Sequence, residues 1–283
     1  MKRAIIVVGV AGCSSLLGLD NTTFEFQDAM SDAPGACDGA PACTASTGRS
    51  ACGQLFATGS AAGLIRAAAP TGTACSGTPA ASGPCALTVF AQAASSYYAR
   101  SGSNKTTGTV DDCGRFAVDD IPTSISDVVV VLRGSAYVET ATLELGRGSA
   151  VGTDTGIAAY AVGSGDVTAW GSQLAGSGSA PTITGGALVV YDGAGAGEQI
   201  RVGGNPVGMQ PNKPWGAYFT GSTVFGTLDP SLTATGSSST ALVVPSAGMA
   251  FTLGGARVGA TCSSSSTVQT VTGVLMAITL TGC

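Results

Sequence analysis

The chain has 283 residues, a formal net charge of −5, no histidine, and charged side chains at only 10% of its positions. The absence of histidine excludes Ser-His-Asp and Cys-His catalysis and histidine-dependent zinc chemistry. With 17 acidic against 12 basic residues and no basic stripe, we expect no binding to nucleic acid and no attraction to anionic lipid. Frequent Gly, Thr, Val and Ser favour strands and turns.

The first residues have the form of an export signal. Met1–Arg3 is basic, and residues 4–11 form a short apolar run that only Gly9 interrupts. A membrane-spanning helix needs about 20 apolar residues, which is far more than this run provides. We therefore predict a signal peptide over residues 1–12, which is removed on export.

Val10-Ala11-Gly12-Cys13 resembles the lipobox, the cleavage signal of bacterial lipoproteins. The resemblance implies cleavage before Cys13, lipid on its sulfur, and attachment to a membrane through several acyl chains. Ser14 follows, whereas Asp at that position favours inner-membrane retention in enteric bacteria, so the expected location is the outer membrane. The alternative is an ordinary signal peptide in which Cys13 is incidental.

The other cysteines form an even set. If Cys13 is lipidated, eight of the nine remain and allow four disulfides without a leftover thiol: Cys37, Cys43, Cys52, Cys75, Cys85, Cys113, Cys262 and Cys283. Sequence alone leaves the connectivity open, and the pairs we favour are Cys37–Cys43, Cys75–Cys85, Cys52–Cys113 and Cys262–Cys283. Zinc is the competing use of clustered cysteines, but without a Cys-x-x-Cys motif or histidine we predict no metal site.

The composition divides the mature chain into four segments. Residues 13–50, rich in Ala, Asp, Gly and Pro, are expected to form a lipidated flexible tether. Residues 51–147 and 182–283 contain short β-prone runs separated by Gly and Pro, and are expected to form two β-sandwich units. Between them, residues 148–181 are expected to be a Gly/Ser-rich junction.

Strand predictions follow from alternating or continuous apolar runs. In the first unit they cover residues 54–57, 87–91, 106–110, 114–118, 128–132 and 137–145. In the second unit they cover 187–191, 199–202, 216–220, 240–244, 249–253 and 267–280, the last as a hairpin that turns at Gly273. The continuous run Val128–Leu132 predicts a strand covered on both faces. The expected fold is all-β, with two small antiparallel sandwiches.

Residues Thr109–Pro122 resemble the carboxypeptidase regulatory-like domains, which are small prealbumin-like β-sandwiches. The resemblance rests on a turn with Gly114, a strand with Phe116 and the closing Ile-Pro pair. Cys113 departs from the usual small polar turn residue. For residues 51–147 the resemblance implies a non-catalytic module that serves stability, spacing or contact.

Acidic residues gather around one predicted strand, Gly114–Val118: Asp111, Asp112, Asp119, Asp120 and Asp127. Paired carboxylates carry out acid–base catalysis or bind calcium in other proteins. Here the two adjacent pairs fall at opposite ends of one strand, about 20 Å apart by strand rise, so they do not share an ion. We expect solvated turns, with calcium as the alternative.

Other catalytic patterns are weak. A Ser-Lys pair would require Lys105 or Lys213, and neither has a serine three residues before it. The run Asp192–Gly197 is rich in Gly after a strand but lacks the lysine of a P-loop, which favours a hairpin loop. We therefore predict no catalytic residues and no cofactor.

Aromatic residues offer one candidate binding surface. Trp215 and Tyr218, with Trp170 and Phe219, would stack on a sugar if exposed, and the alternative is that they belong to the core. The function we expect is that of a non-enzymatic, membrane-anchored envelope lipoprotein with a structural, adhesive or protein-interaction role. The alternative is a β-sandwich that binds carbohydrate or a small ligand at Trp215 and Tyr218. In both cases the partner is an envelope protein or glycan.

Overall fold

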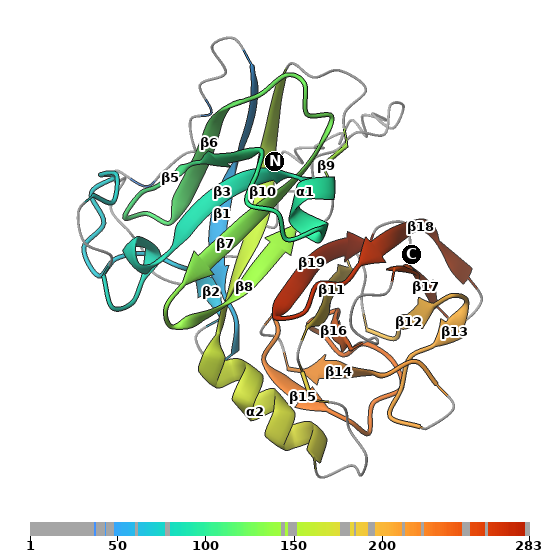
Figure 1. Ribbon diagram of the computed structural model, residues 1–283. Coiled ribbons are helices and arrows are strands. Elements are labelled where there is room, and N and C mark those ends of the chain that lie inside the picture. The colour runs from blue at the N-terminus through green and yellow to red at the C-terminus, as the bar shows by residue number, and fades with distance from the viewer. Residues whose placement is uncertain are drawn as a thin grey trace, which may run out of the picture.

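The computed structural model describes most of the chain after residue 47. The described residues are 37, 43, 48–59, 62–76, 80–142, 145–146, 152–175, 182–183, 185–191, 196–210, 213–221, 224–244, 250–257 and 260–280. Strands dominate them, and the expected all-β class with sandwich-like layers is confirmed (Figure 1).

The first half of the molecule, residues 49–163, contains a short 3-10 helix, a single helical turn and most of the short strands. Its strands are β1 (Arg49–Ala57), β2 (Gly63–Leu64), β3 (Thr88–Ala93), β4 (Lys105–Thr107), β5 (Thr109–Val110), β6 (Arg115–Ile121), β7 (Asp127–Gly134), β8 (Tyr137–Thr142), β9 (Leu145–Gly146) and β10 (Gly152–Gly163). The 3-10 helix η2 (Pro84–Ala86) precedes β3, and the helix α1 (Ala94–Tyr98) follows it. All six strand predictions for this half overlap observed strands.

The second half, residues 164–280, begins with a helix. Its elements are α2 (Ser164–Ala175), β11 (Gly186–Tyr191), β12 (Gln199–Val202), β13 (Asn205–Pro206), β14 (Gly216–Thr220), β15 (Thr227–Asp229), β16 (Thr240–Val243), β17 (Ala250–Arg257), β18 (Ala260–Gln269) and β19 (Val274–Leu280). Strands again overlap every predicted range. The expected hairpin at Gly273 is wrong, because β18 pairs with β17 in a four-stranded sheet while β19 joins the main sheet.

One strand joins the two halves. On one edge, β8 pairs with β7; on the other, it pairs first with the end of β10 and then with β19. The main sheet therefore runs from β15 through β14, β16, β11 and β19 to β8, and from there to β10 and β1. β19 is parallel to both of its neighbours, and β1 is parallel to β10, whereas the sequence led us to expect antiparallel units throughout.

The segment expected to be a Gly/Ser-rich junction, residues 148–181, contains regular secondary structure where it is described. Residues 152–163 form β10, whose register with β1 runs from Gly152 to Ala161, and α2 follows without a break. The sheet thus continues across the boundaries that we placed at residues 147 and 182. Whether residues 51–147 and 182–283 fold as separate units remains a prediction.

Several strands of the main sheet are buried on both faces. In β7, Val129 and Val131 enter a core that extends over both halves, whereas Val128, Val130 and Leu132 enter a second core inside the first half. All five side chains are at most 2% exposed, which confirms the prediction from their continuous apolar run. The main sheet is therefore a middle layer.

Three cores surround this middle layer. The shared core packs one face of the sheet in both halves against the four-stranded sheet β13-β12-β17-β18, through Ile200, Leu253 and Val268. The sandwich core lies between β3–β7 and β1–β6 in the first half. The helix-covered core packs α2 against the second half through Trp170 and Leu174. Figure 1 shows α2 below the junction of the two halves.

A chain of aromatic contacts crosses from one half to the other. Phe56 contacts Tyr160, Tyr160 contacts Phe225, and Phe225 contacts Phe219, with ring centroids 5.8, 5.1 and 5.4 Å apart. Trp170 of α2 then packs on Phe219 at 5.2 Å, and its indole N–H donates to the carbonyl of Gly226. Apolar contact of this kind couples the halves, since each aromatic side chain buries a large area.

Neither α1 nor α2, nor any other helix in the described ranges, has the length and apolar character needed to cross a membrane.

Candidate functional site

Disulfides tie the chain ahead of β1 to the folded body. Cys37 pairs with Cys113 and Cys43 with Cys52, with Cα atoms 5.5 and 5.8 Å apart, while Cys75 pairs with Cys85. The expected Cys75–Cys85 pair is confirmed. The expected pairs Cys37–Cys43 and Cys52–Cys113 are wrong.

The register of β1 explains the error. Cys52 lies opposite Ala117 of β6, and Cys113 is four residues earlier in the chain, about 13 Å away by strand rise. A disulfide needs Cα atoms closer than about 7 Å, so Cys52 and Cys113 must find other partners. Cys13 and Cys283 lie outside the described residues, and so does the side chain of Cys262.

The expected flexible tether, residues 13–50, therefore ends earlier than predicted. It is bonded to the body at Cys37 and Cys43, and Arg49 already belongs to β1. The Arg49 side chain is fully buried. It pairs with Asp154 at 2.9 Å and donates to the carbonyls of Ser126 and Leu145, so that it joins β1, β9, β10 and the loop before β7. A single arginine at the start of a strand gives no sequence signal for such a role.

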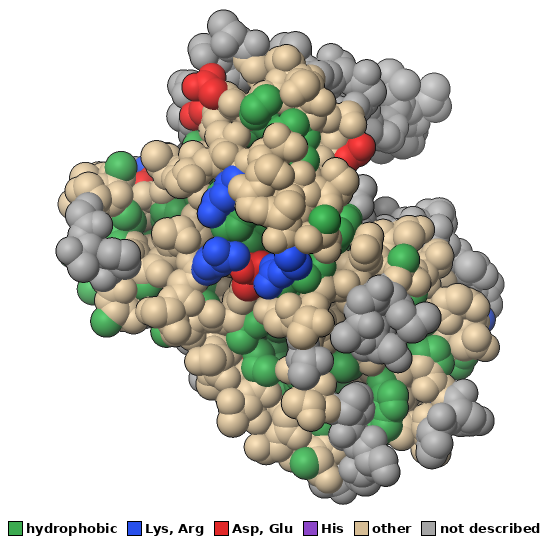
Figure 2. Space-filling view, in the orientation of Figure 1, with side chains coloured by type: hydrophobic (Ala, Val, Ile, Leu, Met, Phe, Trp, Pro, Cys, Tyr) green, Lys and Arg blue, Asp and Glu red, His purple; other side chains and the backbone are tan. Residues whose placement is uncertain are grey.

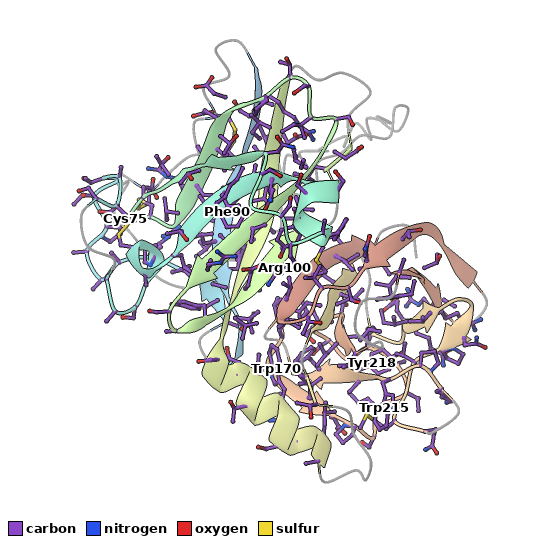
Figure 3. All side chains as sticks on the ribbon, in the orientation of Figure 1. Cys75, Phe90, Arg100, Trp170, Trp215 and Tyr218 are labelled. Atoms are coloured by element: carbon purple, nitrogen blue, oxygen red, sulfur yellow. A yellow bond between two sulfur atoms is a disulfide. The ribbon has the colours of Figure 1, made fainter. Side chains whose placement is uncertain are left out.

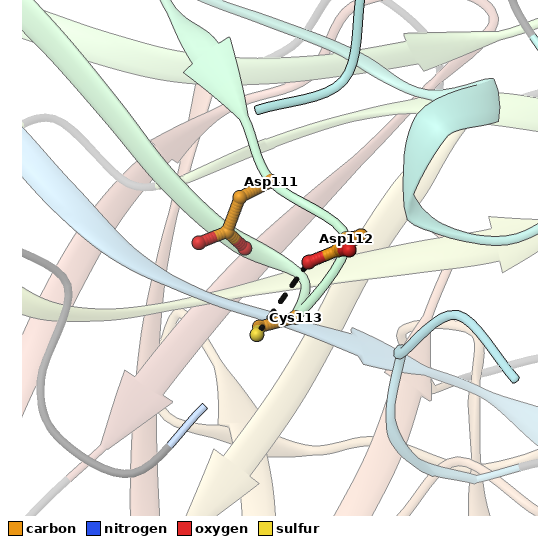
Figure 4. Close-up of side chains that lie close together, drawn as sticks. All are labelled: Asp111, Asp112 and Cys113. Atoms are coloured by element: carbon orange, nitrogen blue, oxygen red, sulfur yellow. Dashed lines mark hydrogen bonds between the residues drawn. The ribbon is translucent and has the colours of Figure 1, made fainter. Parts of the chain in front are cut away.

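The turn between β5 and β6 carries the adjacent acidic residues Asp111 and Asp112 (Figure 4). The Asp112 carboxylate accepts backbone N–H groups from Thr71, Gly72 and Thr73 at 2.8, 2.7 and 3.0 Å, and the Thr71 hydroxyl at 2.8 Å. These hydrogen bonds, the Thr71 amide first among them, hold the pKa of Asp112 below its ordinary value. Through these hydrogen bonds, Asp112 holds the loop 71–73 against the turn.

The neighbours of Asp112 are also engaged. Asp111 accepts the backbone N–H of Arg115 at 2.8 Å and its Nε at 2.6 Å. Cys113 lies 3.7 Å from Asp112 Oδ1, but its sulfur is bonded to Cys37 and has neither a proton to donate nor a thiolate to offer a metal. The chemistry of this donor set does not fit a metal ion.

The remaining aspartates of the cluster lie elsewhere: Asp119 and Asp120 near the end of β6, and Asp127 at the start of β7. This agrees with the expected separation of the pairs along one strand.

The predicted aromatic platform does not form, because most of its members are in cores. Tyr218 and Phe219 have no exposed surface, and Trp170 has 1%. The Tyr218 hydroxyl accepts the backbone N–H of Ile200 at 3.0 Å, and burial raises the pKa of Tyr218 to about 12. Trp215 is half-buried against the helix-covered core. The prediction that Tyr218 binds a ligand is therefore wrong.

The two lysines considered for Ser-Lys catalysis have other surroundings. The Lys105 ammonium lies 3.7 Å from the centroid of the Phe90 ring. Lys213 is half-buried in a turn whose backbone bonds to Gln210. Of the Gly-rich run Asp192–Gly197, residues 192–195 lie outside the described residues.

The surface of the first half carries a charged cluster that the sequence analysis did not predict. Its centre is Glu139 of β8, which is 10% exposed and accepts hydrogen bonds from Arg100 at 2.7 Å, Tyr97 at 2.9 Å and Arg133 at 2.8 Å. Burial raises the pKa of Glu139, but these hydrogen bonds outweigh it and hold the pKa below its ordinary value. Glu139 is therefore a permanent anion at neutral pH.

The cations of this cluster also rest on aromatic rings. Lys105 and Arg133 both lie over Phe90, with Arg133 Cζ 5.4 Å from the centroid, and Arg100 Cζ is 5.9 Å from the Tyr97 ring. Figure 3 shows Phe90 and Arg100 on neighbouring elements of this face, and Figure 2 shows the basic side chains gathered around the acidic one. We call Arg100, Lys105, Arg133 and Glu139 the Glu139 cluster.

A pocket of about 470 Å³ borders the same segment of chain. Tyr98 and Asn104, from the segment that carries Arg100 and Lys105, contribute to its wall. Ser124–Asp127 and Gln269 of β18 complete it, so that both halves of the molecule contribute. Its lining is mostly hydroxyl, amide and carboxylate groups.

The disulfides indicate an oxidising, exported environment for the folded body. Compared with known proteins, the chain matches no protein-family model and no curated protein sequence.

Proposed function

We propose that the chain is a non-catalytic lipoprotein of the cell envelope, anchored in the outer membrane by lipid on Cys13, whose β-rich body has a structural, adhesive or protein-interaction role. The body would include a carboxypeptidase regulatory-like module. Two local features support that resemblance: Gly114 has a left-handed φ of 73° in the turn, and Phe116 is buried in the sandwich core.

The observation that carries the proposal is the bonding of Cys37 to Cys113. Cys37 is only 24 positions after Cys13 in the sequence. Whatever conformation the residues between them adopt, covalent geometry limits their span to about 80 Å. A lipid on Cys13 would therefore keep the β5–β6 turn within about 80 Å of the membrane surface, whereas a tether that continued to residue 50 would allow about 120 Å. A body kept this near the lipid suits contact with the envelope itself.

The polar groups with the strongest interactions already have structural partners. Arg49 and Asp112 join separate segments of the chain, and Asp111 pairs with Arg115 of the same turn. This arrangement supports a non-catalytic role, because a catalytic carboxylate must keep an oxygen available to substrate.

Metabolic labelling with a clickable fatty acid tests the anchor. The full chain should carry the label, Cys13→Ser should abolish it, and the matched Cys75→Ser/Cys85→Ser variant should retain it. Label on Cys13→Ser, or none on the unmodified chain, would overturn the proposal.

Membrane fractionation in an enteric host tests the location. We expect the unmodified chain in the outer membrane and Ser14→Asp in the inner membrane. Recovery of both from the inner membrane would contradict the outer-membrane assignment.

A further inference from the structure

The Glu139 cluster carries more positive charge than its carboxylate can neutralise. Arg100, Lys105 and Arg133 are exposed and surround a single acid, so the local charge is +2 on a chain whose net charge is −5. Basic residues are scarce in this protein, and three of its 12 lie in this one small area. Such a local excess attracts anions.

The cations are held close together despite their repulsion. Lys105 Nζ and Arg133 Cζ lie 3.7 and 5.4 Å from the same Phe90 centroid, so they are at most about 9 Å apart. This distance is close to the Debye length of about 8 Å at physiological salt, so screening removes only part of their repulsion. An oxyanion bound between them would relieve it.

Glu139 fixes the guanidinium groups but leaves much of each one free for solvent. It accepts Nε of Arg133 and Nη1 of Arg100 through different oxygens, while those two side chains remain 53% and 48% exposed. Guanidinium groups held in one orientation lose little entropy when they bind a planar oxyanion. Glu139 thus positions the arginines.

The loop between Arg100 and Lys105 begins in a strained conformation. Arg100 has a φ of 53°, in the left-handed region that residues other than glycine seldom adopt, and Asn104 has a φ of 54°, which asparagine adopts more readily. The Gln92 side chain holds the loop by donating to the carbonyls of Ser101 and Ser103 at 3.4 and 2.9 Å. Backbone strain of this kind concentrates at binding sites, where the surrounding structure maintains it.

The surroundings of the cluster favour a sugar over a membrane or a protein partner. The same loop presents the hydroxyls of Ser101 and Ser103 and the amide of Asn104, and the pocket that Asn104 borders is lined by further hydroxyl and amide groups together with the Asp127 carboxylate. Recognition of an anionic membrane uses four to eight basic residues, more than this cluster offers. Among the described aromatic residues that contact the cluster, Phe90 and Tyr97 are only 3% and 2% exposed, so they offer little apolar surface to a protein partner.

We propose that Arg100, Lys105 and Arg133, positioned by Glu139, bind the carboxylate or phosphate group of an acidic saccharide, whose neutral part contacts the polar pocket beside Tyr98 and Asn104. This site is separate from the Trp215–Tyr218 region and does not depend on the lipid anchor.

Calorimetric titration of the full chain in non-ionic detergent, under oxidising conditions, tests the proposal. The ligands are hexagalacturonate, glucose 6-phosphate and the neutral maltohexaose. We expect binding of at least one acidic sugar, the two sources of oxyanion being told apart by their separate titrations, and no comparable binding of maltohexaose. Equal binding of the neutral sugar, or no binding of either acidic one, would overturn the proposal.

Variants locate the site. Lys105→Gln and Arg133→Gln should each weaken binding about tenfold to a hundredfold, as expected for loss of a charged hydrogen-bond donor. Lys213→Gln removes the same charge from the second half and should leave the affinity within about twofold. Arg133→Lys, which keeps the charge but not the planar fork, should give an intermediate loss. Equal losses at Lys105 and Lys213 would place binding elsewhere.

Vesicles that contain phosphatidylglycerol serve as the last comparison. If the Cys13→Ser chain binds these vesicles and Lys105→Gln abolishes that binding, whereas hexagalacturonate does not compete, the partner is a lipid surface and the saccharide proposal is wrong.

Discussion

The two halves of the molecule are stabilised by different means. In the first half, the Cys37–Cys113 disulfide, the buried Arg49 and the hydrogen bonds of Asp112 join segments that are far apart in the sequence, and two further disulfides close short loops. The described part of the second half relies on the aromatic contacts of Trp170, Phe219 and Phe225 and on apolar strands. The difference shows that one continuous sheet can be held covalently at one end and by packing at the other.

A large effect is expected in the apolar half. Trp170→Ala removes a side chain that is 1% exposed and should lower the free energy of unfolding by about 3–5 kcal/mol, measured by urea denaturation of the full chain. Trp215→Ala, at a half-buried position, is the matched control and should cost clearly less. Hydrogen exchange would show how far the loss extends. Unchanged protection in β1 and β10 would mean that the halves open separately, and equal costs for both tryptophans would contradict the assigned packing.

Two disulfides of the first half close loops of very different length, and they should differ in how much they stabilise the folded state. Cys37 and Cys113 are 76 residues apart and Cys75 and Cys85 only 10. Chain-entropy arguments assign about 4.5 kcal/mol to the longer loop and about 2.7 kcal/mol to the shorter one. Double serine variants should therefore lower the urea midpoint more for the first pair. The reverse order would show that the short loop, not the attachment of Cys37, stabilises this half.

The smallest effect concerns two carboxylates with similar hydrogen bonds. Asp112 joins segments 40 residues apart, whereas Asp229 accepts only the N–H and hydroxyl of Ser231, and hydrogen bonds hold the pKa of both below the ordinary value. A lowered folded-state pKa adds stability above the unfolded value of about 3.9, and this stability is lost as the pH falls through the folded value.

Asp112→Asn should therefore lower the thermal midpoint at pH 7, and the difference from the unmodified chain should shrink below about pH 4. Asp229→Asn should show the same pH dependence with a smaller amplitude. A midpoint difference for Asp112→Asn that persists unchanged at pH 2 would rule out the carboxylate as its cause.

Much of the strand content was predictable because it rests on local patterns. Val128–Leu132 is a continuous apolar run, and a strand that is buried on both faces requires one. The sequence analysis did not predict β10 and α2, because these elements do not rest on a local pattern. The sequence of α2 contains Gly and Thr, which are poor helix formers, and the helix is held by the packing of Trp170 and Leu174 rather than by its propensity.

Features that depend on strand register could not be predicted from the sequence. The disulfide partners follow from the pairing of Cys52 with Ala117, which no local pattern reveals. The Glu139 cluster joins Arg100, Arg133 and Glu139 from three elements. One signal was present: Arg133 and Glu139 flank the turn between β7 and β8, where facing side chains of opposite charge attract each other. The aromatic platform failed because composition cannot distinguish an exposed ring from a buried one.

The position of β19 has a consequence for how the molecule acquires its structure. β19 follows every other described strand in the sequence, yet it lies in the interior of the main sheet, between β11 and β8. Until Val274–Leu280 has been synthesised, the edges of β11 and β8 have no partner there, and the sheet remains in two pieces. Long-range parallel pairing of this kind is slow to form. A chain that emerges gradually from a ribosome or an export channel would stay incompletely folded until this strand arrives, a delay that favours passage across a membrane before the final structure locks.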